Sequence, residues 1–234
     1  MTEAAPKTHD QLVFDLALPP ALGRGDFLPA PANADALAML GQSAQWPQGR
    51  LLLIGPEGAG KSHLAAIWAQ ESGATIHRAR ALRVADIDAL LTEGGAVAVE
   101  DADHVAGLPE AEAALFHLSN LALARKVRLL LSARAPVRDW GLMLPDLRSR
   151  MEAVTVVTLG RPDEGLLEAV LVKQFADRQL MPAPGVIAAL VRRMDRDLGL
   201  ARRVAAAIDA EALAAGRAVT RPLALSALAR LMEG

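Results

Sequence analysis

The sequence has no cysteine and no tyrosine among its 234 residues. The absence of cysteine excludes disulfide bonds, thiolate zinc sites and thiol catalysis, and it is compatible with a reducing cytosol. Aromatic residues make up only 3% of the chain although hydrophobic residues make up 52%, so we expect a core of alanine, leucine, valine and isoleucine. Such a core suits helices and buried parallel strands better than an aromatic-rich antiparallel sandwich.

The chain also lacks an excess of charge of either sign. Its 25 basic and 27 acidic residues leave a formal net charge of −2. A protein so close to neutral is not a bulk nucleic-acid binder, so any contact with DNA has to be weak, local or indirect. No apolar run is long enough to span a bilayer, and residues 1–10 do not resemble a signal peptide. We therefore expect a cytoplasmic protein with no membrane partner.

Apolar runs alternate with segments of helical spacing as far as Gly160. Buried strands are predicted at residues 50–55, 96–99, 128–131 and 154–159, with a candidate fifth at 75–77. Helices are predicted at residues 33–42, 61–71, 84–91, 110–124 and 142–147. Strands that alternate with helices predict an α/β fold with a five-stranded parallel sheet and flanking helices.

The pattern changes after Gly160, because no further strand candidate follows. Helical spacing is present at residues 163–179, 184–194, 198–216 and 222–232, which predicts a small all-α domain. Residues 1–31 are rich in proline and alanine and read as extended. We expect three parts: an N-terminal tail at 1–22, an α/β domain at 23–160 and a helical domain at 161–234.

A glycine-rich motif follows the first predicted strand. Residues 55–62 read Gly-Pro-Glu-Gly-Ala-Gly-Lys-Ser and match the phosphate-loop pattern G-x-x-x-x-G-K-[ST] in full. Glycines let successive backbone N–H groups surround phosphate oxygens, and the N-terminus of the following helix adds positive potential. Lys61 is expected to reach the β- and γ-phosphates and Ser62 to bind Mg²⁺. The alternative, a chance glycine-rich turn, does not explain the complete match between a strand and a helix.

Two acidic residues follow another predicted strand. The apolar residues 96–99 lead into Glu100 and Asp101. Carboxylates at the carboxyl end of a strand near a phosphate loop can hold Mg²⁺ and orient water. The alternative is a solvated strand end, where acidic residues are common. The order Glu-Asp leaves open which acid faces the metal; we assign Glu100, together with Ser62, to Mg²⁺ and Asp101 to catalysis.

Two further polar sites lie near predicted strands. Ser132 ends the strand at 128–131 and is either a turn residue or a contact for the γ-phosphate or the attacking water. Arg148 and Arg150 precede the last strand. Either both arginines belong to a solvated face, or one of them offers its guanidinium group to a phosphate on a neighbouring molecule. Spacing alone does not decide between these interpretations. No histidine spacing predicts a structural metal site.

The motifs together resemble the AAA+ ATPases and, within them, proteins related to the replication initiator DnaA. They read GPEGAGKSHL, AVAVED, LLLSARAP and LRSRMEAVTV, at residues 55–64, 96–101, 129–136 and 147–156. The resemblance covers residues 11–231 but no basic helix-turn-helix domain, which favours the regulatory inactivators of DnaA over the initiator itself. It implies an AAA+ P-loop NTPase core with a small all-α lid, with ADP or ATP and Mg²⁺ as cofactors. The candidate nucleotide-binding residues are Gly55, Pro56, Glu57, Gly58, Ala59, Gly60, Lys61, Ser62 and His63.

The resemblance also implies roles for single residues. Arg150 matches the arginine finger and Ser132 the first sensor of the family. The position where the family has a phosphate-sensing lid arginine holds Gly199 here, and Arg202 and Arg203 follow one turn later. We therefore expect weak intrinsic ATP hydrolysis.

The tail carries a short motif, because Gln11-Leu12-Val13-Phe14-Asp15-Leu16 resembles the peptide that docks such proteins on the sliding clamp of DNA polymerase, its β subunit. The candidate clamp-binding residues are Gln11, Leu12, Phe14 and Leu16, although the family pattern has leucine where this chain has Phe14. The alternative is a strand that packs on its own domain.

The predicted function is an adenine-nucleotide-binding regulator of replication initiation that docks on the clamp and promotes hydrolysis of DnaA-bound ATP. Its predicted partners are DnaA and the clamp, and a homodimer or higher oligomer remains open. Two rival interpretations are a helicase-loader or transposition-helper ATPase that acts on DNA and a structural module with a vestigial nucleotide site.

Overall fold

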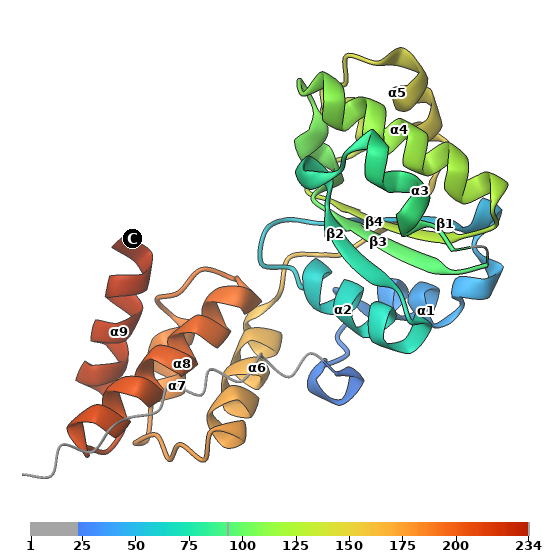
Figure 1. Ribbon diagram of the computed structural model, residues 1–234. Coiled ribbons are helices and arrows are strands. Elements are labelled where there is room, and N and C mark those ends of the chain that lie inside the picture. The colour runs from blue at the N-terminus through green and yellow to red at the C-terminus, as the bar shows by residue number, and fades with distance from the viewer. Residues whose placement is uncertain (1–22, 93, 234) are drawn as a thin grey trace, which may run out of the picture.

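The computed structural model describes residues 23–92 and 94–233 of the chain. These residues form an α/β unit and a helical unit that lie side by side (Figure 1). The candidate clamp-binding residues Gln11, Leu12, Phe14 and Leu16 lie outside the described residues.

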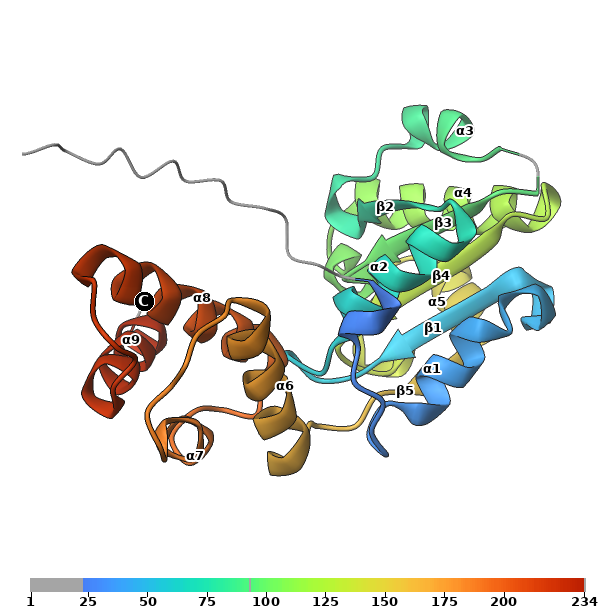
Figure 2. The same ribbon diagram turned by 90° about the horizontal axis from the view of Figure 1, so that it is seen from below.

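The α/β unit contains one parallel sheet, as the sequence predicted. Its five strands are ordered β2-β3-β4-β1-β5 (Figure 2). The strands are β1 at Arg50–Ile54, β2 at Thr75–Arg78, β3 at Ala96–Glu100, β4 at Arg128–Ala133 and β5 at Thr155–Thr158. Leu53 of β1 pairs with Ser132 of β4, so the loop that leaves β1 begins beside the end of β4. The candidate strand at 75–77 is confirmed as the edge strand β2, and its mostly exposed side chains explain its weak apolar pattern.

Helices cover both faces of the sheet (Figure 1). One face carries α1 at Ala34–Gly41 and α2 at Lys61–Ser72, and the other carries α3 at Ile87–Leu90, α4 at Pro109–Ala124 and α5 at Pro145–Glu152. Leu52, Val97 and Leu129 of the strands belong to the core on the α4 side, and Leu51, Leu53 and Leu130 belong to the core on the α2 side. Alanine, leucine, valine and isoleucine dominate both cores, as the composition predicted.

Two helices of the α/β unit differ most from their predicted bounds, and in the helical unit the helix predicted at 184–194 is shortened to Val186–Val191. The helix predicted at 142–147 begins at Pro145 and extends to Glu152, so that Arg148 and Arg150 are helical. The reason is that proline fixes its own φ near the helical value and needs no N–H in the first turn, which makes Pro145 a natural start. The helix predicted at 84–91 is reduced to a 3-10 turn at Val84–Asp86 and the single turn α3.

The three buried tryptophans belong to the α/β unit. Trp46 stacks on Trp68 with a centroid distance of 5.2 Å, and the guanidinium of Arg128 lies 6.0 Å from the Trp68 ring centroid. The indole N–H of Trp140 donates a 2.7 Å hydrogen bond to the carbonyl of Ala135 in the segment between β4 and α5. These indoles supply the large apolar volumes of a core otherwise built from small aliphatic side chains.

The helical unit has its own hydrophobic core. It contains α6 at Glu164–Asp177, α7 at Val186–Val191, α8 at Leu198–Ala215 and α9 at Arg221–Glu233. Asp163 caps α6 by accepting the N–H of Leu166 at 2.7 Å, and Asp197 caps α8 by accepting the N–H of Leu200 at 2.9 Å. None of the helices among residues 23–92 and 94–233 is long and apolar enough to cross a membrane.

Candidate functional site

The predicted phosphate loop connects β1 to α2. Its backbone takes left-handed conformations at Gly58 (φ +73°) and Gly60 (φ +99°), which glycine adopts without steric cost. Lys61 is the first residue of α2, and its Nζ donates hydrogen bonds to the carbonyls of Gly55 at 2.7 Å and Pro56 at 2.9 Å. Burial lowers the pKa of Lys61, and the nearby charge of Asp101 opposes that shift. The loop therefore holds a largely buried ammonium group next to a turn of backbone N–H groups.

The predicted acidic pair lies at the carboxyl end of β3. Glu100 is buried, whereas Asp101 faces the cleft with a left-handed backbone (φ +55°). The guanidinium of Arg78, on the neighbouring strand β2, forms ion pairs with both acids, at 3.5 Å to Glu100. Ser132 is buried, and its Oγ accepts the N–H of Asp101 at 3.3 Å. The first-sensor candidate thus contacts the backbone of the catalytic candidate.

The phosphate loop opens into a cleft of about 270 Å³ between the two units. Of the predicted nucleotide-binding residues, those that line it are Glu57, Gly58, Gly60, Lys61, Ser62 and His63. Gly55, Pro56 and Ala59 do not line it: the first two carry the carbonyls that bind Lys61, and Ala59 is buried in the core. Glu100 and Ser132 are also outside its lining, whereas Asp101 belongs to it. The structure therefore brings most of the predicted loop together with one of the two acids.

The helical unit contacts the phosphate loop directly. The N–H of Leu198, at the start of α8, donates a 3.0 Å hydrogen bond to the carbonyl of Gly58. A Cβ atom added at Gly58 would lie 2.4 Å from Cγ and 2.6 Å from Cα of Asp197, so a glycine is required for this close approach. The start of α8 is therefore docked on the phosphate loop.

We expect Gly58→Ala to destabilise the protein more than Gly73→Ala does. Both glycines have a similar left-handed φ, +73° and +70°, so alanine costs about 1 kcal/mol at either position. A Cβ at Gly73 meets nothing within 4 Å, whereas a Cβ at Gly58 collides with the backbone of Asp197. The additional cost at Gly58 should be about 1–3 kcal/mol. Urea unfolding of the two variants measures the difference, and equal losses would mean that the helical unit does not dock on the loop in solution.

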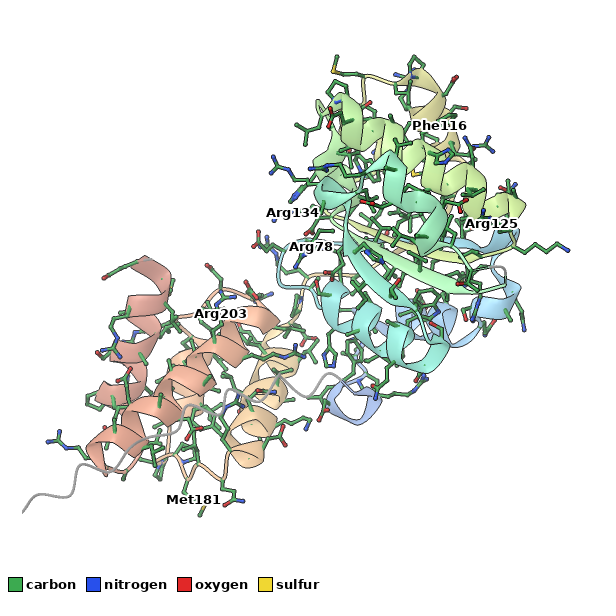
Figure 3. The ribbon with its side chains drawn as sticks, viewed as in Figure 1. Arg78, Phe116, Arg125, Arg134, Met181 and Arg203 are labelled. Atoms are coloured by element: carbon green, nitrogen blue, oxygen red, sulfur yellow. The ribbon has the colours of Figure 1, made fainter. Side chains whose placement is uncertain are left out.

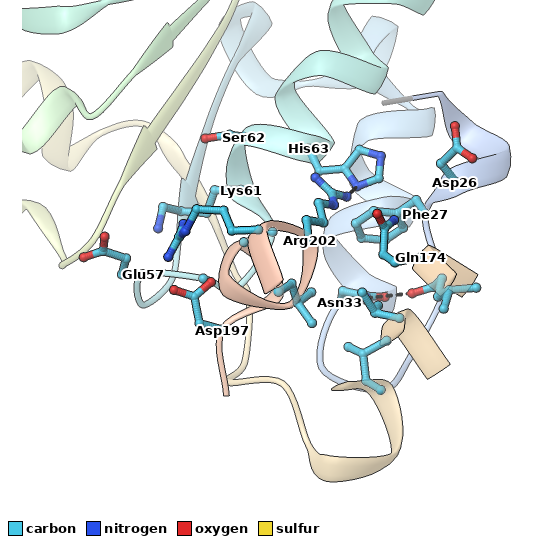
Figure 4. Close-up of a pocket in the computed structure, with 18 of the residues that line it drawn as sticks. Asp26, Phe27, Asn33, Glu57, Lys61, Ser62, His63, Gln174, Asp197 and Arg202 are labelled. Carbon is cyan, nitrogen blue, oxygen red and sulfur yellow. Dashed lines mark hydrogen bonds between the residues drawn. The ribbon is translucent and has the colours of Figure 1, made fainter. Parts of the chain in front are cut away.

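His63 and Arg202 form a second contact between the units (Figure 4). Burial, and then the charge of Arg202, lower the pKa of His63 to about 4, so its ring is neutral near pH 7 and Nδ1 accepts from the guanidinium. Phe27 packs edge-on against the imidazole with a centroid distance of 5.2 Å. Nε2 of His63 is buried and has no hydrogen-bond partner among the described residues. The contact between His63 and Arg202 therefore joins α2 to α8.

The segment before α1 forms one wall of the cleft, which the sequence did not predict. Residues 23–31 were expected to be extended, yet Phe27 is buried in the core beside the phosphate loop. Asp26 pairs with Lys173 of α6 at 2.9 Å, and the hydrogen bond from Lys173 lowers the pKa of Asp26. The other wall residues from these two segments are Leu28, Asn33, Leu166, Val170 and Gln174. A single aromatic residue in a proline-rich stretch was the only available signal.

Three arginines line the cleft and are exposed (Figure 3). Arg78 holds the acidic pair, and Arg134, two residues beyond Ser132, pairs with Glu57 of the phosphate loop at 3.2 Å. Arg203 approaches Gly199, where an added Cβ would lie 3.5 Å from its Nη1. The guanidinium of Arg203 thus lies close to the position where the resemblance expects a lid arginine. Together with Lys61 these groups give the cleft a positive lining suited to phosphate oxygens.

Arg150 lies away from this cleft. It is half-buried near the end of α5 and does not line the cleft, whereas Arg148 is exposed. Burial lowers the pKa of Arg50, and the positive charge of Arg150 lowers it further, so the two guanidinium groups lie within electrostatic range. Arg50 is the first residue of β1, and the phosphate loop follows Ile54, the last residue of that strand. The two ends of β1 are about 13 Å apart. Helix α5, which carries Arg150, ends three residues before Thr155, and Thr155 pairs with Leu51 near the start of β1. Arg150 is therefore near the end of β1 that is opposite the protein's own phosphate loop.

The donor groups of the cleft fit a nucleoside phosphate with a divalent cation. The loop presents backbone N–H groups and an ammonium group, and Ser62 and Asp101 supply oxygen atoms of the kind that Mg²⁺ prefers. Within residues 23–92 and 94–233 there is no group of three or more histidine, cysteine, aspartate or glutamate residues that could hold a metal alone. A cation here would depend on phosphate oxygens, as Mg²⁺ does in P-loop proteins.

Solved structures with the same fold are known, although no family model and no curated protein matches this chain. The chain is similar to domain III of the replication initiation protein DnaA from Thermotoga maritima, with a TM-score of 0.75, 17% identity, and coverage of 90% of this chain and 97% of that one. It is also similar to DnaA bound to AMPPCP and single-stranded DNA, with a TM-score of 0.67, 15% identity, and coverage of 81% of this chain and 65% of that one. A RuvB variant from Thermotoga maritima has a TM-score of 0.62 at 16% identity, over 85% of this chain and 67% of that one.

These similarities show the fold of the chain. The five-stranded parallel sheet with its flanking helices is the fold of an AAA+ P-loop NTPase domain. The fold is similar to that of domain III of DnaA. At these identities the likeness concerns the fold alone.

Proposed function

We propose that the protein binds ADP or ATP with Mg²⁺ in the cleft between its two units. The observation that supports this most directly is the phosphate loop, where a buried lysine lies beside left-handed glycines and the N-terminus of α2. In this proposal Lys61 contacts the phosphates, Ser62 and one of the two acids hold Mg²⁺, and Phe27 and His63 lie at the nucleoside end of the cleft. Some of the similar DnaA structures contain AMPPCP, which agrees with this assignment.

The lid cation in this proposal is Arg203. Its guanidinium lies close to Gly199, at the mouth of the cleft. Arg202 is already in contact with His63, so Arg203 is the arginine of α8 that remains available for a phosphate. Because Arg203 reaches the cleft from one turn later than the family position, its alignment with the γ-phosphate differs, in keeping with weak intrinsic hydrolysis.

We further propose that the protein is a regulator of replication initiation of the Hda type. It would dock on the DNA-loaded sliding clamp through Gln11, Leu12, Phe14 and Leu16 and promote hydrolysis of ATP bound to DnaA. The position of Arg150, near the end of β1 that is remote from its own phosphate loop, supports action on a nucleotide held by another protein. The full resemblance of the motifs to DnaA-related proteins supports DnaA as that protein.

A reconstituted assay tests this function. The full chain is mixed with ATP-loaded DnaA, with and without clamp on DNA, and DnaA-bound ATP is followed in single turnover. We expect faster hydrolysis only when the clamp is present. ATP hydrolysis by the chain itself, stimulated by single-stranded DNA without DnaA, would instead identify a helicase-loader type of ATPase.

Deletion of residues 1–18 should abolish clamp binding and leave the fold intact. A single short peptide motif should bind with an affinity on the order of micromolar. Gln11→Ala should weaken binding, and Thr8→Ala, just outside the motif, serves as the matched control. Surface plasmon resonance on immobilised clamp measures all three. Undiminished binding of the truncated chain would show that the clamp contacts another surface.

A further inference from the structure

Among the described residues, Glu112 has the most completely buried carboxylate. All of its hydrogen-bond partners are backbone N–H groups. Glu112 lies in the first turns of α4 and is 1% exposed. Oε1 accepts the N–H of Gly107 at 3.0 Å, both oxygens accept the N–H of Met143 at 3.0 and 3.1 Å, and Oε2 accepts the N–H of Leu144 at 2.7 Å. Hydrogen bonds that involve a charged group are stronger than neutral ones, so this is a firm local anchor.

Two of these donors belong to the start of α5. Leu144 is the N-cap residue of this helix, and Pro145 is its first residue and has no N–H of its own. The carboxylate of Glu112 therefore fixes the point at which the chain enters α5, and its negative charge suits the N-terminus of a helix. Leu147 and Met151 are fully buried and hold one face of α5 against the core. The helix is thus fixed at its beginning and along one side.

Arg150 is on the same helix, six residues beyond Leu144. A helix of eight residues is about 12 Å long, so a small tilt at its start displaces its end by an ångström or so. The neighbouring positive charge of buried Arg50 also acts on this end of α5. The direction in which Arg150 projects therefore depends on how firmly the beginning of α5 is held.

We propose that Glu112 is a positioning residue for Arg150, acting through helix α5. The effect of Glu112 on the stimulation of DnaA rests on the proposed function, whereas its effect on the position of α5 does not. Loss of the anchor leaves the nucleotide cleft untouched, because neither Glu112 nor α5 lines it. It lets α5 move relative to the sheet, so that the guanidinium of Arg150 is misplaced relative to the phosphate it would stabilise. Misplacement of a reacting group by about 1 Å can cost about 10²-fold in rate.

The test compares Glu112→Gln with Glu110→Gln in the full chain. Both positions are on the first turns of α4, but Glu110 is exposed and carries none of these hydrogen bonds. Hydrogen exchange should be faster by about tenfold or more at Gly107, Met143 and Leu144 and along α5 in Glu112→Gln, with other protected amides and ADP affinity unchanged. Glu110→Gln should exchange like the wild type. Glu112→Asp keeps the negative charge on a shorter side chain and should give an intermediate exchange rate. This substitution serves as the second variant if Glu112→Gln does not fold.

The functional measurement is stimulation of DnaA-bound ATP hydrolysis. Glu112→Gln should lower the maximal stimulated rate by about tenfold to 10²-fold. The concentration of the variant that gives half of its maximal stimulation should not change. The double variant with Arg150→Ala should be no slower than Arg150→Ala alone, because both changes act through one group. Wild-type exchange in α5 of Glu112→Gln overturns the proposal. Faster exchange in α5 together with an Arg150→Ala variant that stimulates fully would support the anchor and instead refute the proposed role of Arg150.

Discussion

The Arg150→Ala variant is expected to bind nucleotide and the sliding clamp normally while losing the stimulation of DnaA-bound ATP hydrolysis. Phosphoryl transfer depends mainly on positioning and on charge stabilisation, and a guanidinium group fits the charge that spreads over the transferring phosphate oxygens. An arginine supplied in trans contributes about 10³–10⁵ to the rate, so the stimulation should fall to near the level of DnaA alone. Because Arg150 is near the end of β1 opposite the phosphate loop, its loss should not affect nucleotide affinity.

Arg148 provides the matched control for this experiment. It is on the same helix and is exposed, so Arg148→Ala should have the smaller effect. Arg150→Lys should not restore the rate, because a single ammonium group lacks the planar fork of a guanidinium. The measurement is a single-turnover assay with ATP-loaded DnaA and clamp on DNA. Full stimulation by Arg150→Ala would remove the main structural support for action in trans.

Lys61→Ala is expected to lower the affinity for ADP and ATP by about 10²-fold or more. The reason is that Lys61 is largely buried at the phosphate loop, and a buried charge pair that loses one partner costs about 2–5 kcal/mol. In the protein alone, the ammonium is held by the carbonyls of Gly55 and Pro56. Alanine removes both a buried charge and its hydrogen bonds, so we expect little change in stability without nucleotide. The stabilisation that ADP gives by binding the folded state should be lost.

Calorimetric titration and thermal melting with and without ADP measure these two effects. Lys126→Ala is the control, because Lys126 is an exposed lysine just before β4, at the edge of the sheet where that strand begins. Lys126 already has a left-handed backbone, so alanine adds no new backbone cost there. Equal ADP affinity of Lys61→Ala and the wild type would exclude the phosphate loop as the nucleotide site.

The sequence predicted those parts of the site whose residues are neighbours in the chain. The phosphate loop, Lys61 and Ser62 follow from one contiguous motif, and the strands that position it follow from short apolar runs. Start points of helices depend on single residues, so the beginning of α5 at Pro145 was placed wrongly although the helix itself was foreseen. Local pattern is thus enough for the framework of the fold.

Contacts between distant segments were not predictable in this way. Gly58 was expected to serve a phosphate, and its close approach to Asp197 depends on the docking of α8. Arg78 is on the edge strand β2, and only the parallel register with β3 brings it beside Glu100. Glu112 has no pattern of its own, because its two partners at the start of α5, Met143 and Leu144, follow 31 and 32 residues later. These features depend on tertiary geometry, on which spacing along the chain carries no information.

The distribution of the tryptophans has a spectroscopic consequence. All three indoles, at Trp46, Trp68 and Trp140, are buried in the α/β unit, and α6–α9 contain none. Intrinsic fluorescence therefore follows the unfolding of the sheet and its flanking helices, whereas far-ultraviolet circular dichroism also receives a large signal from the helical unit. Coincident transitions by the two methods would mean that both units unfold together, and separate transitions would reveal a helical unit that melts on its own.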